Sequence, residues 1–137
     1  MQVSCGWYHN VARGVRPDGS LAFYGWGKND LKQLPVRSVD ENVSYVVDPV
    51  PLSPLPEDRT MVEVWCGSEF TIALDDAGCL WSHGWNEHGN LGIGHQNALG
   101  EDRVWRPIQS LRLLYPWEGF LACGGAHVIC IGSTDPA

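Results

Sequence analysis

The chain has 137 residues, a formal net charge of −7 and 44% hydrophobic residues. This length suits one ordinary globular domain with a sizeable core. The nine basic residues are scattered and form no stripe, so we predict no nucleic-acid partner. The sequence has no charged leader, no signal-peptide core and no run of ~20 apolar residues. We therefore expect no membrane partner and a cytoplasmic or nuclear location, or both.

One short phrase occurs three times along the chain. The three segments read VSCGWYHNVA, VWCGSEFTIA and LACGGAHVIC. Their cysteines Cys5, Cys66 and Cys123 lie 61 and then 57 residues apart. A recurring unit of this length indicates stacked supersecondary blocks. Branched residues around a fixed glycine favour a buried strand that turns where a side chain would not fit, so each unit is predicted to be β-structure.

The second half of the unit occurs twice. Asp18-Gly19 and Asp76-Ala77-Gly78 each lie between apolar runs, which indicates a hairpin because Asp and Gly tolerate positive φ. Gly27-Lys28-Asn29 follows the first hairpin and Gly84-Trp85-Asn86 follows the second, each leading to a leucine. The repeat therefore extends from the strands into the loop. Sixteen glycines, nine prolines and no long helical periodicity favour many short strands and little helix.

The repeat divides the chain into five predicted segments. These are a first unit at 1–34, a Pro-rich acidic insert at 35–60, a second unit at 61–120, the opening strands of a third unit at 121–132, and a tail at 133–137. We expect the insert to be mostly loop, because proline removes a ladder donor and acidic side chains disfavour burial. Val43–Val47 is expected to form an edge strand. The insert is either a variable connection or a binding loop on a rigid scaffold.

These motifs resemble the repeat of the regulator-of-chromosome-condensation family of seven-bladed β-propellers. The shared features are Cys-Gly, a His four residues after the Cys, the Asp-Gly hairpin, and Gly-x-Asn followed by Leu. Phe70 departs from this pattern, because it stands where the other units have His9 and His127. Residues 84–92 are most similar to two branches, the secretion-regulating guanine nucleotide exchange factor and the alpha-tubulin suppressor. The resemblance implies an all-β, partial β-propeller with antiparallel blades and an incomplete ring of about two to two and a half blades.

The resemblance also implies that further blades precede this segment. An open fan of blades would leave strand edges with unpaired N–H and C=O groups, and such edges pair readily with other chains. We therefore expect the isolated segment to self-associate through its open edges.

The sequence offers little support for a catalytic or metal-binding site. His83, Glu87, His88 and His95 lie close together, but in a glycine-rich loop at ordinary repeat positions, so we predict no metal site. The five cysteines lack CxxC spacing and favour buried structural thiols. Neither a phosphate loop nor a dinucleotide motif is present, and buried cysteines make poor nucleophiles. We expect no catalytic residue, no cofactor and no enzymatic activity.

The turns provide the predicted partner surface, because an exposed aromatic residue beside charge is typical of an interface anchor. Asn29 and Asn86 are expected to hold their turns through backbone hydrogen bonds. Tryptophans 65, 81 and 105 are expected to pack between blades. The candidate partner-binding residues are Trp85, Glu87, His88, Lys28, Asp30, Trp7, Tyr8 and Glu69.

Three interpretations of function remain open. The first, implied by the resemblance, is a non-enzymatic scaffold that docks a small regulatory protein and affects tRNA wobble-uridine and diphthamide modification. The second is guanine nucleotide exchange on a small GTPase, which other members of the family perform. The third is a fragment without independent function. The wedge and acidic contacts used for exchange in the family do not map onto this segment, so we favour the scaffold.

Overall fold

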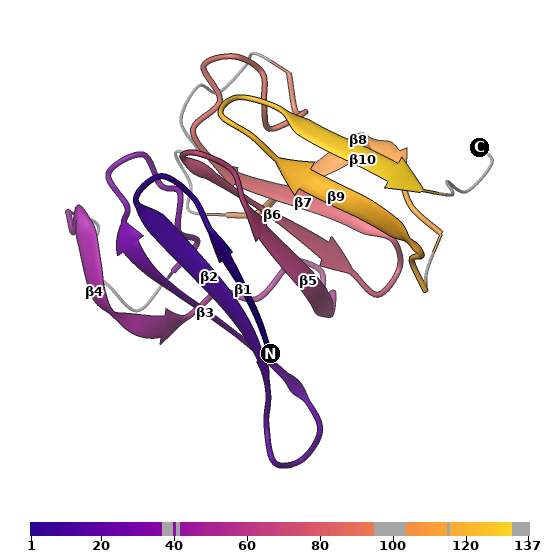
Figure 1. The fold of residues 1–137 in the computed structure, drawn as a ribbon, viewed down its shortest axis with the longest axis horizontal. Coiled ribbons are helices and arrows are strands. Elements are labelled where there is room, and N and C mark those ends of the chain that lie inside the picture. Colours follow the sequence, from indigo (N-terminus) through magenta and orange to yellow (C-terminus); the bar gives the residue numbers. More distant parts are fainter. Residues whose placement is uncertain (37–39, 41, 95–103, 115, 133–137) are drawn as a thin grey trace.

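The computed structural model describes residues 1–36, 40, 42–94, 104–114 and 116–132, and all its regular elements are strands (Figure 1). In chain order they are β1 (Gln2–Cys5), β2 (His9–Val15), β3 (Leu21–Lys28), β4 (Tyr45–Pro51), β5 (Met61–Cys66), β6 (Phe70–Asp75), β7 (Cys79–Gly84), β8 (Arg106–Arg112), β9 (Gly119–Cys123) and β10 (Val128–Gly132). The predicted all-β class is confirmed. Among the described residues, no helical segment reaches the length and hydrophobicity of a bilayer span.

The strands form three antiparallel sheets that follow one another like the blades of a fan (Figure 1). The first sheet has the order β1-β2-β3-β4, and the second has the order β5-β6-β7-β8. Strands β9 and β10 form a two-stranded sheet, which we call the terminal hairpin. Every pairing joins consecutive strands, so each sheet is a simple up-and-down meander.

The three Cys-Gly segments have the same backbone geometry. In each segment the cysteine pairs with the residue five positions later: Cys5 with Asn10, Cys66 with Thr71, and Cys123 with Val128. The hairpins at the far ends also match, since Gly19 and Gly78 have φ values of 84° and 82°. Only glycine adopts this left-handed region without strain, which explains the repeated Asp-Gly signal.

The insert predicted at 35–60 contributes the fourth strand of the first sheet. The edge strand expected at Val43–Val47 begins two residues later and ends four residues later, at Tyr45–Pro51, and pairs with β3. Pro49 and Pro51 lie within it, although proline was expected to favour loop. They are tolerated because β4 is the outermost strand of its sheet, where one edge needs no ladder donor.

Two hydrophobic clusters hold the sheets together. The first cluster joins the first and second sheets and includes Val11, Leu34, Val64, Cys66 and Trp81. The second cluster joins the second sheet to the terminal hairpin and includes Phe70, Ile72, Leu80, Leu91 and Leu121. Because the second sheet contributes to both clusters, every residue of β6 is buried. Each sheet therefore buries its apolar faces only against its neighbours.

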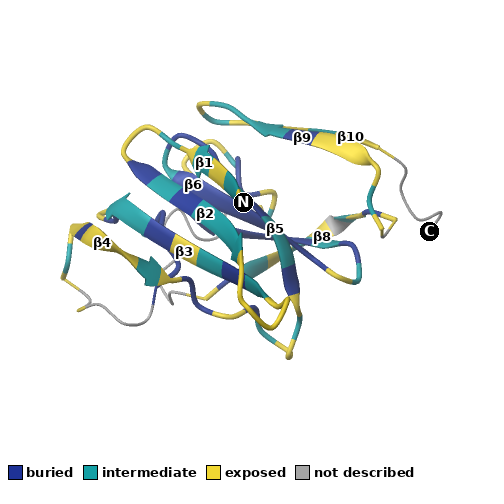
Figure 2. Cartoon of the chain, turned by 60° about the horizontal axis from the view of Figure 1, so that its bottom comes forward, coloured by how far each residue is buried: buried dark blue, intermediate teal, exposed yellow. Residues whose placement is uncertain are grey.

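No described sheet covers the outer face of the first sheet or of the terminal hairpin (Figure 2). Val3 of the first sheet is 53% exposed, whereas Val64, its equivalent in the second sheet, is 1% exposed. On the terminal hairpin, Ile129 and Ile131 are 51% and 65% exposed, and Figure 2 shows β10 as a mostly exposed strand. Cys5 is also exposed, contrary to the expected burial of the repeat cysteines, because no sheet covers it in the described chain.

Candidate protein-interaction surface

The Cys-Gly turns are fixed by one contact that recurs three times. The glycine N–H donates to the carbonyl three residues later, at 2.8 Å in each turn: Gly6 to His9, Gly67 to Phe70 and Gly124 to His127. The ring of that third residue folds back over the glycine, where any Cβ would overlap it. A side chain at the glycine would therefore displace the ring, which explains why each unit keeps glycine at this position.

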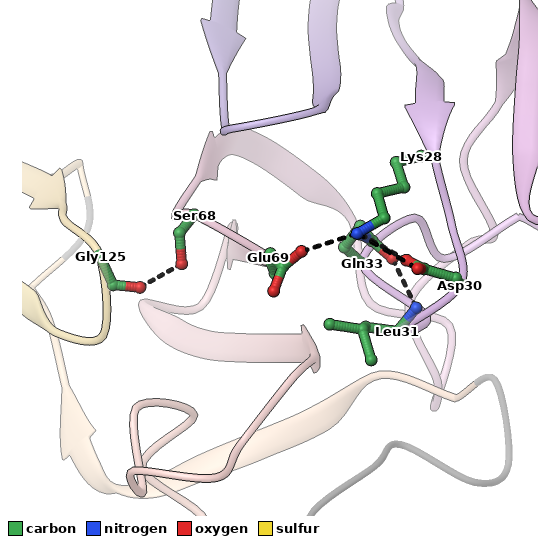
Figure 3. A network of polar contacts seen from close by, with 7 residues as sticks. All are labelled: Lys28, Asp30, Leu31, Gln33, Ser68, Glu69 and Gly125. Carbon is green, nitrogen blue, oxygen red and sulfur yellow. Dashed lines mark hydrogen bonds and ion pairs between the residues drawn. The ribbon is translucent and has the colours of Figure 1, made fainter.

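Adjacent turns are tied to one another across the sheets. The Trp7 N–H donates to the Ser68 carbonyl at 3.0 Å, and the Ser68 N–H donates to the Gly124 carbonyl at 3.2 Å. The Ser68 hydroxyl also donates to the Gly125 carbonyl (Figure 3). The sequence alone gave no reason to single out Ser68, because nothing in its local pattern shows that its partner lies in another unit. These bonds align the three turns along one rim.

The Gly-x-Asn loops join the same rim. Asn29 Oδ1 accepts from the Leu34 N–H at 2.9 Å, and Asn86 Oδ1 accepts from the Leu91 N–H at 3.0 Å. The predicted structural role of both asparagines is confirmed. The residue between Gly and Asn attaches each loop to the Cys-Gly turn of its own sheet. These attachments are Lys28 N–H to Tyr8 O at 2.7 Å and Trp85 N–H to Glu69 O at 3.0 Å.

Lys28 connects the first and second sheets at this rim (Figure 3). Its Nζ lies 3.1 Å from Glu69 Oε1 and 3.2 Å from Asp30 Oδ2. It also lies 5.2 Å from the centre of the Tyr8 ring, which adds a cation–π contact. The hydrogen bonds that the Lys28 ammonium donates to Glu69 and then to Asp30 raise its pKa above the usual value. These contacts give Lys28 and Glu69 a role between sheets, and their predicted role in partner binding stays a prediction.

The remaining candidates project into solvent from the same two kinds of turn. Trp7 and Tyr8 are 68% and 60% exposed. Trp85 is half-buried and meets His88 edge-on, with 5.0 Å between ring centres, while Glu87 is exposed beside them. We call these five residues the aromatic rim. The hydrogen bonds above hold the backbones of Trp7, Tyr8 and Trp85, so these large side chains are presented at little conformational cost.

His9 lies directly beneath the rim and is completely buried. Its Nε2 lies 3.2 Å from Thr71 Oγ1, and the Thr71 hydroxyl donates to the Gln33 carbonyl at 2.5 Å. Because the Thr71 hydroxyl proton is directed at Gln33, Thr71 Oγ1 accepts a hydrogen bond from the His9 Nε2–H. Burial lowers the pKa of His9 to about 4, and a hydrogen bond from the ring to the Phe70 backbone opposes this shift more weakly. The sequence marked His9 only as a repeat position and did not reveal this link between sheets.

The cysteine, histidine and glutamate side chains considered as catalytic or metal-binding groups do not form a common site. Burial raises the pKa of both Cys66 and Cys123 to about 12, which disfavours a thiolate at either residue. His83 is buried, and its Nδ1 donates to the Lys32 carbonyl, away from the exposed Glu87 and His88. His95 lies outside the described residues. Among the described residues, no three His, Cys, Asp or Glu side chains are grouped closely enough to hold a metal ion.

Comparisons with known proteins agree with this architecture. The model of the "Regulator of chromosome condensation (RCC1) repeat" matches residues 19–74, which run from the first hairpin into β6. Three antiparallel sheets joined by repeated Cys-Gly and Gly-x-Asn turns define the chain as part of a β-propeller. The chain belongs to the RCC1 repeat family.

Two curated relatives and one solved structure show the extent of the likeness. The chain is 36% identical over 93 residues to the ultraviolet-B receptor UVR8 of Arabidopsis thaliana, covering 68% of the chain and 19% of that protein. It is 33% identical over 149 residues to the mouse secretion-regulating guanine nucleotide exchange factor, covering 94% of the chain and 28% of that protein. The structure of yeast RCC1 (Prp20) with Kap60 bound superposes with a TM-score of 0.69 at 18% identity, covering 96% of the chain and 29% of Prp20. The chain thus spans less than a third of each of these proteins.

Proposed function

We propose that the chain is part of a non-enzymatic scaffold that binds a protein partner through the aromatic rim. The observation that carries this proposal is the exposure of Trp7 and Tyr8 on turns whose backbones are fixed on both sides. Exposed Trp and Tyr side chains are frequent anchors of protein interfaces. An anchor that is already rigid loses little entropy on binding, so the rim suits recognition of a folded partner.

The charge of the rim indicates the kind of partner. Glu87 of the rim and Asp30 are exposed, and the whole chain has a formal charge of −7. A basic protein surface would therefore be attracted and oriented by the rim. The likeness to Prp20, which was solved with Kap60 bound, supports a binding role for this kind of fold. We propose a cytoplasmic or nuclear location for this scaffold. Its link to tRNA wobble-uridine and diphthamide modification rests on the resemblance of residues 84–92 and stays a prediction.

Guanine nucleotide exchange on a small GTPase is a second candidate function. The observation in its favour is the 33% identity to the secretion-regulating guanine nucleotide exchange factor. The chain spans 28% of that protein, so any exchange activity would be expected only with the remainder of such a propeller present. The two candidates differ in a measurable way, because exchange accelerates nucleotide release and scaffolding does not.

Affinity capture followed by quantitative mass spectrometry tests the aromatic rim. We expect the double variant Trp7→Ala, Trp85→Ala to lose partners that the unchanged chain captures, while Val47→Ala retains them. Val47 is a matched control because it is 84% exposed but lies on β4, the outermost strand of the first sheet. Equal capture by all three proteins would show that the rim is not the binding surface. Recovery of a GTPase whose nucleotide release is accelerated by the chain would favour exchange instead.

A further inference from the structure

A pair of tryptophans lies at the junction between the second sheet and the terminal hairpin. Trp65 on β5 and Trp117, just before β9, meet edge-on, with 5.7 Å between ring centres and 82° between ring planes. The repeat spacing makes Ser4 and Thr60 their counterparts at the junction between the first and second sheets. A residue that the packing of the repeat itself requires would recur in each unit. The two rings therefore point to a role that is particular to this junction.

Trp117 carries an unsatisfied polar group that an apolar residue would not have. Its indole Nε1 is buried and has no hydrogen-bond partner within the described part of the chain. The same atom lies against Gly119 and Gly132, where a Cβ would overlap it. An unsatisfied buried N–H destabilises a fold, so leucine or phenylalanine would suit this position better if packing were its only requirement. What the indole adds is a large π face.

A cavity of about 530 Å³ opens against this pair of rings. Both tryptophans line it, together with Phe120, which is 61% exposed, and the buried Leu74. The cavity adjoins β5, which lies between β1 and β9 (Figure 1). Of the described residues that line it, none belongs to β1 or β10, so its walls do not depend on the first or last strand of the chain. Its volume is in the range of small-ligand sites.

The charges beside the cavity favour a cation. Arg13 and Glu63 both line it, and each side chain is 28% exposed. Arg13 Nη1 donates to the Glu63 carboxylate and, at 3.0 Å, to the Val62 carbonyl, so the guanidinium charge is compensated within the wall. Glu118, the neighbour of Trp117, is exposed and adds negative charge. Since the whole chain has a formal charge of −7, its field also attracts cations.

We propose that this cavity, which we call the tryptophan pocket, binds a trimethylammonium group. The faces of Trp65 and Trp117 stand nearly at right angles, so they form an aromatic corner in which a cation meets two π faces. A trimethylammonium group carries its charge under methyl groups and enters an apolar cavity at a smaller desolvation cost than a strongly hydrated primary ammonium. The tryptophan pocket shares no residue with the aromatic rim, so this proposal stands apart from the rim function.

Choline and its neutral carbon analogue, in which a tert-butyl group replaces the trimethylammonium group, are matched probes. They have the same shape and differ in charge, so their affinities for the full chain separate cation recognition from simple apolar burial. We expect isothermal titration calorimetry to show choline binding about threefold to thirtyfold more tightly than the analogue. Equal affinities of the two compounds, or no binding of choline, would overturn the proposal.

Two charge variants give opposite expected effects. Glu63→Gln removes the carboxylate and leaves Arg13 uncompensated, so choline should bind about twofold to fivefold more weakly. Arg13→Gln removes the repelling guanidinium and frees the Glu63 carboxylate, so choline should bind about twofold to fivefold more tightly. Both changes are at partly exposed positions and remove no core side chain. The reverse order of affinities would show that the pocket does not recognise a cation.

Ring variants locate the bound cation. Trp65→Leu and Trp117→Leu should each weaken choline binding at least about fivefold, while Trp65→Phe keeps a π face and should lose less. Tyr45→Leu is the matched control, because Tyr45 is 58% exposed but lies on β4, away from the pocket, and should leave the affinity unchanged. Equal losses in Trp65→Leu and Tyr45→Leu would contradict the assignment. If the tryptophan variants fail to fold, the charge variants and the neutral analogue keep the test decisive.

A further probe identifies the source of the trimethylammonium group. A glycine-flanked peptide with one trimethyl-lysine presents the group on a protein side chain, whereas choline presents it on a free small molecule. Tighter binding of the peptide would assign the pocket to a modified protein, and tighter binding of choline would assign it to a small cation, and both results support the proposal. The same peptide with unmodified lysine should bind at least about threefold more weakly. Equal binding of the two peptides would overturn recognition of the methylated group.

Discussion

The first strands of the first and second sheets, β1 and β5, each end in Val-x-Cys, but these shared residues differ in exposure. Val3 is 53% exposed and Val64 is 1% exposed, and Cys5 is exposed where Cys66 is buried. The local sequences are alike, and the backbone register is the same. The difference arises because the first sheet covers the second, whereas no described sheet covers the first. Whether a repeated residue is buried therefore depends on whether a neighbouring sheet covers it, as in other repeat architectures.

The largest expected difference is in thiol reactivity. With a pKa of about 12, the Cys66 thiol is thiolate in only about one molecule in ten thousand at pH 8. It is also buried, so we expect Cys66 to react with iodoacetamide at least about a thousandfold more slowly than the exposed Cys5. Mass spectrometry of the labelled peptides measures both rates in one sample. Similar rates in the native protein would show that Cys5 and Cys66 are equally accessible to solvent. Equal rates in denaturant are the control.

Paired substitutions in β6 and β10 test the comparison of covered and open faces by their effect on the free energy of unfolding. Ile72 is completely buried, and its repeat equivalent Ile129 is 51% exposed. We expect Ile72→Ala to lower the free energy of unfolding by about 2–5 kcal/mol because it leaves a cavity between sheets. Ile129→Ala should lower it by less than about 1 kcal/mol, since little apolar surface is lost from a packed site. Urea denaturation measures both, and comparable losses would contradict the assignment of open and covered faces.

The His9 site should make stability depend on pH. Its pKa is 6.5 when unperturbed and about 4 in the folded protein, so the unfolded chain binds the proton first as the pH falls. This contribution is fully present above pH 6.5 and is lost between pH 6.5 and about 4, for a total of about 3 kcal/mol.

The second sheet supplies the control substitution for this pH dependence. Phe70 occupies the equivalent position, with its ring over the Cys-Gly glycine, so His9→Phe should fit the same space without titrating. We expect the variant to lose less stability than the unchanged chain in urea titrations between about pH 7 and pH 4. An identical pH dependence of the two proteins would show that His9 is not the titrating group.

Much of the fold could be predicted from local patterns. The Cys-Gly and Asp-Gly signals predicted the strands and hairpins, because each depends on a backbone conformation that few residues adopt. The Gly-x-Asn pattern predicted the role of Asn29 and Asn86 for the same reason. Strand β4 ends four residues later than expected and includes two prolines, because proline is unfavourable in a strand only when its missing N–H faces a neighbour. Edge position is a tertiary property that no local pattern shows.

The candidate surface was predicted less completely. The sequence grouped Lys28, Asp30 and Glu69 with the exposed aromatic residues, because all lie in turns. The structure separates them, since Lys28 pairs with both acids and joins two sheets, while Trp7 and Tyr8 remain exposed.

The sequence by itself determined the repeating unit, its strand register and its turn geometry, since these depend on residues close together in the chain and on the conformational limits of glycine, aspartate and asparagine. Only the tertiary structure decided which copies of a repeated residue are buried and which meet solvent. The physical reason is that an apolar face of one sheet is removed from water by the next sheet, about 60 residues away in the chain. Similar local sequences therefore lead to a packed core at Cys66 and to an open face at Cys5.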